Sequence, residues 1–439
     1  MKKITRSSRR RLALTTTTAI VLASALASCS ANTGAEGEAV ELSLLVPSGV
    51  DQELAEAYAD AFTETHDDIT IKVETRPTGP DGENVIRTRL STGEMSDVFI
   101  FNSGSLLSSL SPDNSLVDLS DQEFLGDISE DFLSVVSGDD GTYGVPWGTS
   151  RAGGIMYNKA VYAQLGLEIP ETWAQFEQNN AAIAAAGLVP VVQTYGDNFT
   201  AQILILADFA NVAATDPDWA EKYTMNERSF AEEPALTSFE KLETLADAEA
   251  FNRDFASATY DDGIRLVAEG EAGHYPMLTN YVATNVTANY PDAADDVGFF
   301  AVPTSSADTA TMTIWMPLAA YIPRSIPDDK RAAAEEFLGF LSSPEGCAVH
   351  AATASPAGPY LTEGCAVPDT AMPFVSDVAS YVDGDRSSLA LEFLSPVKGT
   401  NLPQFSVEIG SGISSAEKAA ADYDNDVAKQ AKQLGLPGW

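Results

Sequence analysis

The sequence has few of the residues that build metal and redox sites. Only three cysteines and three histidines occur among its 439 residues. The histidines, at positions 66, 274 and 350, do not have the spacing of a metal-ligand pair. A Walker A loop and a Gly-x-Ser-x-Gly motif are also missing. We therefore expect no bound metal, no other cofactor, no ATP hydrolysis and no esterase chemistry.

Basic residues are scarce as well. The chain holds 25 lysines and arginines against 64 aspartates and glutamates, which gives a formal charge of −39. Six of the positive charges lie in residues 1–11, so the remainder carries −39 − 6 = −45. Nucleic-acid binding needs a basic surface, so we expect no nucleic-acid partner. The overall field also disfavours capture of anions, and an acidic surface that keeps an exposed protein soluble accounts for the charge.

No apolar run in the sequence is long enough to span a membrane. Residues 1–28 combine a basic head with an apolar stretch, Leu12 to Leu26, that four threonines dilute. The segment Leu26-Ala27-Ser28-Cys29 resembles a lipoprotein signal, in which cleavage leaves a lipidated Cys29 at the N-terminus. An ordinary secretory signal and twin-arginine export are alternatives. We expect residues 29–39, which are small, polar and acidic, to tether the protein to the outer face of the cell membrane.

The other two cysteines, Cys347 and Cys365, fit an exported protein. Outside the cell they can pair, and the bond would close a loop of 18 residues. Such a disulfide stabilises a protein by about 3 kcal/mol, mainly by restricting the unfolded chain. We therefore expect a structural disulfide here.

The start of the exported part alternates strands and helices. Apolar patterns predict strands over residues 40–46 and 69–75, with an amphipathic helix over 51–65 between them. A strand, a helix and a strand in this order form a right-handed crossover in a sheet covered by helices. The fold class is therefore α/β. Because ligands bind at the carboxyl ends of strands in such sheets, we expect the loop at residues 47–51 beside a cleft.

Residues 141–190 carry five short motifs in order. They are Tyr-Gly-Val-Pro, Tyr-Asn-Lys, Leu-Gly-Leu, Pro-x-Thr-Trp and Ala-Gly-x-x-Pro. Their turn and helix signals predict a strand at residues 155–157 followed by two helices, the second with Thr172 as its N-cap. Together the motifs resemble the extracellular solute-binding proteins of ABC importers, in the branch that is similar to maltose-binding protein and takes up sugars.

This resemblance covers roughly residues 40–435 and implies a type II, two-lobed periplasmic-binding-protein fold. Each lobe is then a mostly parallel sheet flanked by helices, and the ligand lies in the cleft between the lobes. The resemblance further implies a monomeric, non-catalytic subunit that captures a sugar or oligosaccharide outside the cell and delivers it to ABC permease subunits. The expected boundaries are residues 40–149 and 312–352 for lobe 1, residues 150–303 and 358–439 for lobe 2, and crossings near 148–151, 304–311 and 352–359.

A sugar presents C–H groups on one face and hydroxyls around its rim, so aromatic rings and polar side chains would form its site. Each candidate also has a structural alternative: Asn102 and Ser103 would cap a helix, and Arg151 would form a hinge ion pair. The aromatic candidates are Trp147, Tyr195, Tyr281 and Trp315. The polar candidates are Asp97, Asn102, Ser103, Arg151, Gln193, Asp197, Asn280 and Gln404.

The sequence leaves two other functions open. A binder of a non-sugar solute, such as a polyol, an amino-acid derivative or a peptide, would share the fold. A secreted glycoside hydrolase would need two carboxylates at a fixed separation, and no short segment of the chain pairs them convincingly.

Overall fold

The computed structural model describes residues 39–307 and 309–439 of the chain. The expected signal peptide (residues 1–28), the lipidated Cys29 and nearly all of the tether lie outside the described residues. In the part that the structure describes, none of the helices combines the length and the apolar character needed to cross a bilayer.

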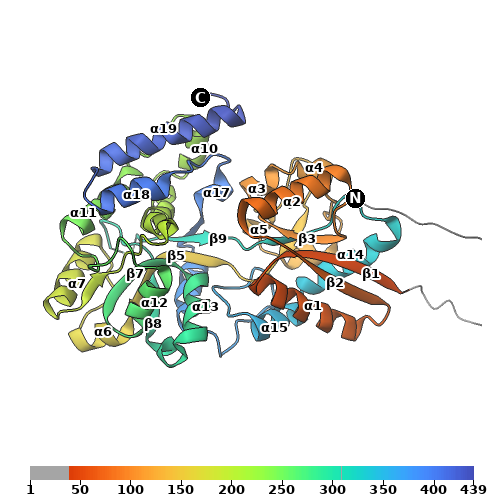
Figure 1. Cartoon of the computed structure of the whole chain (residues 1–439), viewed down its shortest axis with the longest axis horizontal. Coiled ribbons are helices and arrows are strands. Elements are labelled where there is room, and N and C mark those ends of the chain that lie inside the picture. Colours follow the sequence, from red (N-terminus) through yellow and green to blue (C-terminus); the bar gives the residue numbers. More distant parts are fainter. Residues whose placement is uncertain (1–38, 308) are drawn as a thin grey trace, which may run out of the picture. The chain divides into compact units, whose positions relative to one another are not determined.

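The first sheet has the strand order β2-β1-β3-β10-β4. Its strands are β1 (Val40–Pro47), β2 (Ile69–Arg76), β3 (Val98–Phe101), β4 (Gly144–Pro146) and β10 (Ala319–Tyr321). Strand β1 pairs in parallel with β2 and β3, whereas β10 is antiparallel to β3 and β4. Helix α1 (Val50–Thr65) joins β1 to β2, which confirms the expected strand, helix and strand (Figure 1).

The second sheet has the order β11-β9-β5-β7-β6, with β8 also paired to β5. Its strands are β5 (Arg151–Asn158), β6 (Val189–Val191), β7 (Ala272–Leu278), β8 (Val297–Phe300), β9 (Met312–Trp315) and β11 (Ser387–Leu389). Strand β5 runs antiparallel to β7, β8 and β9. Both sheets thus contain one strand that opposes its neighbours, β10 in the first and β5 in the second, and each follows a crossing from the other sheet. We call the first sheet with its helices the first lobe, and the second sheet with its helices the second lobe.

Helices pack on both sheets (Figure 1). Those of the first lobe are α1, α2 (Gly79–Thr92), α3 (Ser105–Ser108), α4 (Pro112–Ser115), η1 (Glu123–Asp127), α5 (Glu130–Val135), α14 (Asp328–Leu341) and α15 (Pro344–Thr353). Those of the second lobe before β9 are α6 (Lys159–Leu165), α7 (Trp173–Ala185), η2 (Asn198–Gln202), α8 (Ile203–Ala207), α9 (Phe209–Thr215), α10 (Trp219–Thr224), α11 (Leu236–Asp247), α12 (Tyr260–Ala268), α13 (Thr279–Asn289) and η3 (Pro291–Asp296). Those after β9 are α16 (Phe374–Asp383), α17 (Leu391–Leu394), α18 (Leu402–Gly410) and α19 (Ala416–Leu434).

A local signal explains where α7 begins, and buried aromatic side chains explain how other helices of the second lobe pack. Thr172 caps α7 as expected, in a capping box with Gln175. Buried aromatic side chains then fix α10, α11 and α19 against one another, among them Trp219, Phe239 and Tyr423.

Two of the three crossings between the lobes differ from the expected positions. The first joins β4 to β5 across residues 147–150, close to the expected 148–151. The second lies at residues 316–318, between β9 and β10, and not at 304–311. The physical reason is long-range pairing, because β9 is held in the second sheet by β5 and β11. Residues 312–315 therefore belong to the second lobe and not to lobe 1.

The third crossing begins later than expected. Residues 357–359 run beside the first crossing, where the Ser150 amide donates to the Pro359 carbonyl at 3.1 Å. The chain then returns to the first lobe, because the amide of Ser129 donates to the Leu361 carbonyl at 2.8 Å. The expected disulfide between Cys347 and Cys365 is present and holds this return. The final passage to the second lobe thus lies between Cys365 and α16, and not at residues 352–359.

Candidate functional site

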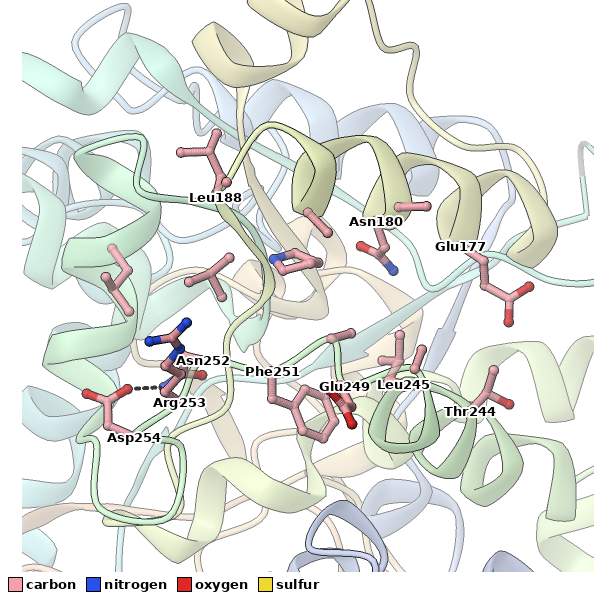
Figure 2. A pocket seen from close by; sticks show the side chains of 18 residues that line it. Glu177, Asn180, Leu188, Thr244, Leu245, Glu249, Phe251, Asn252, Arg253 and Asp254 are labelled. Carbon is pink, nitrogen blue, oxygen red and sulfur yellow. Dashed lines mark hydrogen bonds between the residues drawn. The ribbon is translucent and has the colours of Figure 1, made fainter.

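Among the described residues, the cavities with the most room for a small solute include one within the second lobe and one between the lobes. The larger, of about 850 Å³, lies entirely in the second lobe between α7 and α11. Figure 2 shows Glu177 and Asn180 of α7 facing Phe251, Glu249 and Leu245 on the opposite wall. The other, of about 570 Å³, is lined by both lobes, and we call it the cleft. A ligand in the cleft would touch both lobes, whereas one in the larger cavity would touch only the second, so the cleft is the candidate site.

The residues that line the cleft come from the two lobes and from the crossings between them. The first lobe supplies Arg87, Asn102, Ser103, Ser105, Leu106 and Ser109. The crossings and the adjacent strand start supply Arg151, Met316, Pro317 and Leu318. The second lobe supplies Gln202, Glu392, Phe393, Pro396, Lys398, Gly399, Thr400, Pro403, Gln430 and Leu434.

Sheet topology explains why these segments meet. Asn102 and Ser103 follow the carboxyl end of β3, and Met316 follows the carboxyl end of β9. Arg151 begins β5, but β5 is antiparallel to β9, and the register pairs Arg151 with Trp315 at the same edge of the sheet. The Ser103 hydroxyl donates to the Pro317 carbonyl at 3.1 Å, which ties the end of β3 to the second crossing.

Arg151 is the half-buried cation of the cleft. Its Nη2 donates to the Met316 carbonyl at 3.3 Å, and its buried Nε has no partner among the described residues. Burial lowers the pKa of this guanidinium, and the nearby Glu392, Tyr281 and Asp51 oppose the shift. An Arg side chain stays protonated under these conditions, so the cleft holds a fixed positive charge with a free donor.

An ion pair between Lys398 and Glu392 also lines the cleft. Lys398 Nζ is 3.2 Å from a carboxylate oxygen of Glu392, and both side chains are about one-third exposed. The same two residues also line a much smaller space beside Trp315, so the tryptophan lies next to the cleft. Its indole covers Gly153, where a Cβ would come within 2.5 Å of the ring.

Asp51, in the first turn of α1, is a half-buried acid behind the first crossing. Asp51 accepts a hydrogen bond of 3.0 Å from the Trp147 indole nitrogen. Burial raises the pKa of Asp51, and the Trp147 bond with the charges of Arg151 and Arg76 lowers it in part. Asp51 thus lies near Arg151 of the cleft, but none of residues 47–51 lines the cleft itself.

The predicted site residues fall into two groups. Asn102, Ser103 and Arg151 line the cleft. Trp147, Trp315 and Tyr281 lie close to it, but the two tryptophans are buried, at 5% and 6% exposure. Tyr281 lies in the first turn of α13, half-buried against Phe199. These six residues stay candidates for ligand contact.

The remaining four candidates lie elsewhere and have structural partners. Asp97 precedes β3, at the opposite end of that strand from Asn102, and accepts bonds from Ser43 and Lys330. Asp197 accepts from the amide of Tyr260, which begins α12, at 2.8 Å. The sequence-based prediction that these two bind ligand is therefore not supported by their positions.

The last two of these candidates, Tyr195 and Gln404, also lie outside the cleft lining. Tyr195 is buried inside the second lobe against Phe255 and Gly410. Gln404 is exposed on α18 and bonds to Glu408 at 3.1 Å, although its neighbour Pro403 lines the cleft. The two additional candidates, Gln193 and Asn280, each have a buried side-chain oxygen with no partner among the described residues.

Sequence reasoning missed the contribution of residues 392–400. Glu392, Phe393, Lys398 and Thr400 all line the cleft, yet none was a candidate. The run Pro396-Val397-Lys398-Gly399-Thr400 carries proline and glycine between apolar segments, which is a loop signal. That signal marks a loop but does not show that the loop faces the first lobe.

Comparison with known families identifies the chain. The family model described as bacterial extracellular solute-binding protein matches residues 47–346, more than half of the 439 residues. The chain belongs to this family. The sequence-based resemblance is thereby confirmed at the level of the family.

Individual relatives are distant. The multiple sugar-binding protein of Streptococcus mutans is 23% identical over 229 residues, which cover 51% of this chain and 53% of that protein. The melibiose/raffinose/stachyose-binding protein of Bacillus subtilis is 23% identical over 315 residues, or 68% of this chain and 69% of that protein. The alignment with the first thus spans about half of that relative's length.

A solved structure supports the fold. The solute-binding protein RafE, in complex with raffinose, superimposes with a TM-score of 0.72 at 20% identity, over 89% of this chain and all of that chain. This likeness confirms the two-lobed α/β architecture of a solute-binding protein.

Proposed function

We propose that this solute-binding protein captures a sugar or oligosaccharide outside the cell and delivers it to the permease subunits of an ABC importer. The observation that carries the proposal is the cleft itself, which both lobes line with hydroxyls, amides, charged groups and the ring of Phe393. Such groups suit a ligand with a hydroxylated rim and C–H faces. The sugar-binding names of two relatives and the raffinose complex of RafE support the choice of ligand.

Capture would depend on the movement of the two lobes. A ligand that contacts Asn102 of the first lobe and Lys398 of the second stabilises the state in which both reach it at once. It shifts the balance between open and closed states only by its differential affinity for the two. Closure also excludes water, which strengthens the hydrogen bonds to the sugar.

The proposal also includes export of the protein and its attachment to the cell membrane by a lipid. Cleavage before Cys29 and lipidation of this residue would fix the protein to the outer face of the cell membrane, on a short acidic tether. The family and the compared relatives are binding proteins. We infer that this chain also binds its ligand without converting it, and that it works as a monomer.

Calorimetric titration against a panel of mono- and oligosaccharides tests the proposal. We expect one sugar to bind at one site per chain with micromolar or tighter affinity. Asn102→Ala should weaken that binding, whereas Asn84→Ala, an exposed asparagine of α2 in the same lobe, should leave it unchanged. Silence of every sugar would favour a polyol, amino-acid derivative or peptide, and slow loss of one sugar during titration would indicate an enzyme.

A further inference from the structure

The cleft reverses the charge balance of the chain. Acidic residues outnumber basic ones, 64 to 25, in the whole sequence. The larger cavity of the second lobe follows this trend, with Glu177, Glu249 and Asp254 against Arg253 (Figure 2). The cleft is lined instead by Arg87, Arg151 and Lys398, with Glu392 as the one acid among the described residues that line it. The two cavities therefore differ in the sign of the charge that they present to a ligand.

Two of the three cations already have a partner. Lys398 is paired with Glu392 at 3.2 Å. Arg87 lies 3.4 Å from Glu83, on the preceding turn of α2, and donates to the Ser109 hydroxyl at 3.1 Å. These pairs are partly exposed, so their charges stay available to a ligand that enters the cleft.

Arg151 is different, because no carboxylate of the described residues is in ion-pair contact with it. Its one hydrogen bond goes to a neutral acceptor, the Met316 carbonyl, and its buried Nε has no partner within the described chain. Nearby Asp51 is occupied by the Trp147 indole. A largely buried cation without a paired anion is costly, and a planar guanidinium is best satisfied by a bidentate oxyanion.

We propose that the ligand of the cleft is an acidic saccharide, whose carboxylate or phosphate pairs with Arg151. This inference rests on the proposed function and narrows its ligand class. Lys398, which belongs to the second lobe like Arg151, adds another positive charge, and Glu392 accepts hydrogen bonds from sugar hydroxyls. The second lobe would thereby hold the anionic group, and Arg87 of the first lobe lines the same cleft.

Binding of an acidic ligand would depend on direct contacts with basic side chains and not on the net charge of the protein. The chain carries a formal charge of −39, which repels anions at a distance. At physiological ionic strength this repulsion is screened beyond about 8 Å. Inside a cleft that excludes water, direct contact with a guanidinium is much stronger than the screened field. An acidic protein can therefore bind an acidic ligand where basic residues in the cleft contact that ligand directly.

Matched pairs of sugars test the inference by calorimetric titration of the protein. Galacturonate with galactose, and glucuronate with glucose, differ in a carboxylate, and glucose 6-phosphate with glucose differs in a phosphate. Oligomers of galacturonate and of galactose extend the first pair. We expect at least one acidic member to bind about tenfold or more tightly than its neutral partner. The carboxylate and phosphate arms tell which anion the cleft prefers.

Variants separate charge recognition from general effects. Arg151→Met should weaken binding of the acidic sugar about tenfold or more and its neutral partner much less, and Arg151→Lys should restore part of the loss. Lys398→Met should act in the same direction, and remains informative if the Arg151 variant does not fold. The matched control is Arg253→Met, which removes an exposed cation that lines the other cavity.

The outcomes distinguish this inference from the proposed function. Neutral sugars that bind as tightly as their acidic partners would overturn the acidic ligand and leave sugar capture intact. Equal losses for both members of a pair in Arg151→Met and Lys398→Met would also overturn it. Silence of all sugars, acidic and neutral, would overturn the proposed function and the inference with it.

Discussion

The ring of Phe393, in the second lobe, packs directly on Gly104 of the first. A Cβ placed on Gly104 would lie 2.6 Å from Phe393 Cδ1 and 3.2 Å from the Glu392 carbonyl oxygen. Gly104 also has a φ of +68°, in the left-handed region that favours glycine. The two lobes therefore meet at α3 and α17, beside the residues that line the cleft, and the contact leaves no room for a methyl group.

Gly104→Ala should hinder this approach of the lobes. We expect the affinity for the bound sugar to fall about tenfold, the equivalent of about 1.4 kcal/mol. Calorimetric titration measures the loss, and small-angle X-ray scattering should show a more extended protein. Because the backbone strain of alanine at positive φ contributes too and Phe393 itself lines the cleft, the control compares Gly104→Ala with wild type and again in the Phe393→Ala background, where it should cost less affinity. Wild-type affinity in the single variant would mean that the liganded lobes do not meet here.

Trp315→Ala should lower stability as well as affinity. The sequence favours a stacking platform that can be removed without unfolding, but the indole is only 6% exposed and covers Gly153. Loss of a buried tryptophan costs about 3–5 kcal/mol. Urea unfolding measures this cost, and Tyr281→Ala, at a half-buried site, is the comparison that should lose less stability. An unchanged urea midpoint for Trp315→Ala would contradict the packing role.

Local patterns predicted the fold better than the site. Strand β1, helix α1 and the cap at Thr172 depend on neighbouring residues, and the sequence placed them within one or two positions. The disulfide Cys347–Cys365 followed from counting cysteines in an exported chain. Sheet membership is different, because residues 312–315 join the second sheet only through partners more than 70 positions away in the chain.

The candidate site, too, depends on contacts between residues far apart in the sequence, which local patterns do not predict. Asn102 and Asp97 are five residues apart, and both have polar side chains suited to a ligand. The strand between them spans about 13 Å, so one lies at the cleft edge of the sheet and the other at the far edge. Lys398 was missed for the opposite reason, because only the tertiary fold brings the loop after α17 to the end of β3.

Removal of the disulfide should affect stability without affecting binding. The Cys347–Cys365 bond closes a loop of 18 residues in the first lobe, and neither cysteine lines the cleft. The double variant Cys347→Ser with Cys365→Ser should lose about 3 kcal/mol of unfolding free energy. Its sugar affinity, measured well below the unfolding midpoint, should match that of the wild type. A selective loss of affinity at full folding would instead tie the bond to the movement of the lobes.

Acid should destabilise the protein through two buried histidines. His274 lies in the second lobe, with its Nε2 2.6 Å from the Tyr162 hydroxyl. Its Nδ1 is 2.9 Å from the side-chain oxygen Oδ1 of Asn180 and 3.0 Å from the backbone carbonyl oxygen of Pro190. The neutral ring satisfies this arrangement by donating from Nδ1 and accepting at Nε2. Burial lowers the pKa of His274 to about 3, and it lowers the pKa of His350 to about 4.

These shifts set the direction of the pH dependence. The unfolded chain binds protons at these two histidines below a pH of about 6.5, whereas the folded protein binds them there only at about pH 4 or lower, so stability is full above that window and falls as the pH decreases through it. Each histidine contributes a slope of at most about 1.4 kcal/mol per pH unit. Urea unfolding between pH 7 and pH 4.5 measures the slope. His274→Gln should lower stability at pH 7 but flatten the decline. A wild-type slope in His274→Gln would show that other groups cause the acid sensitivity.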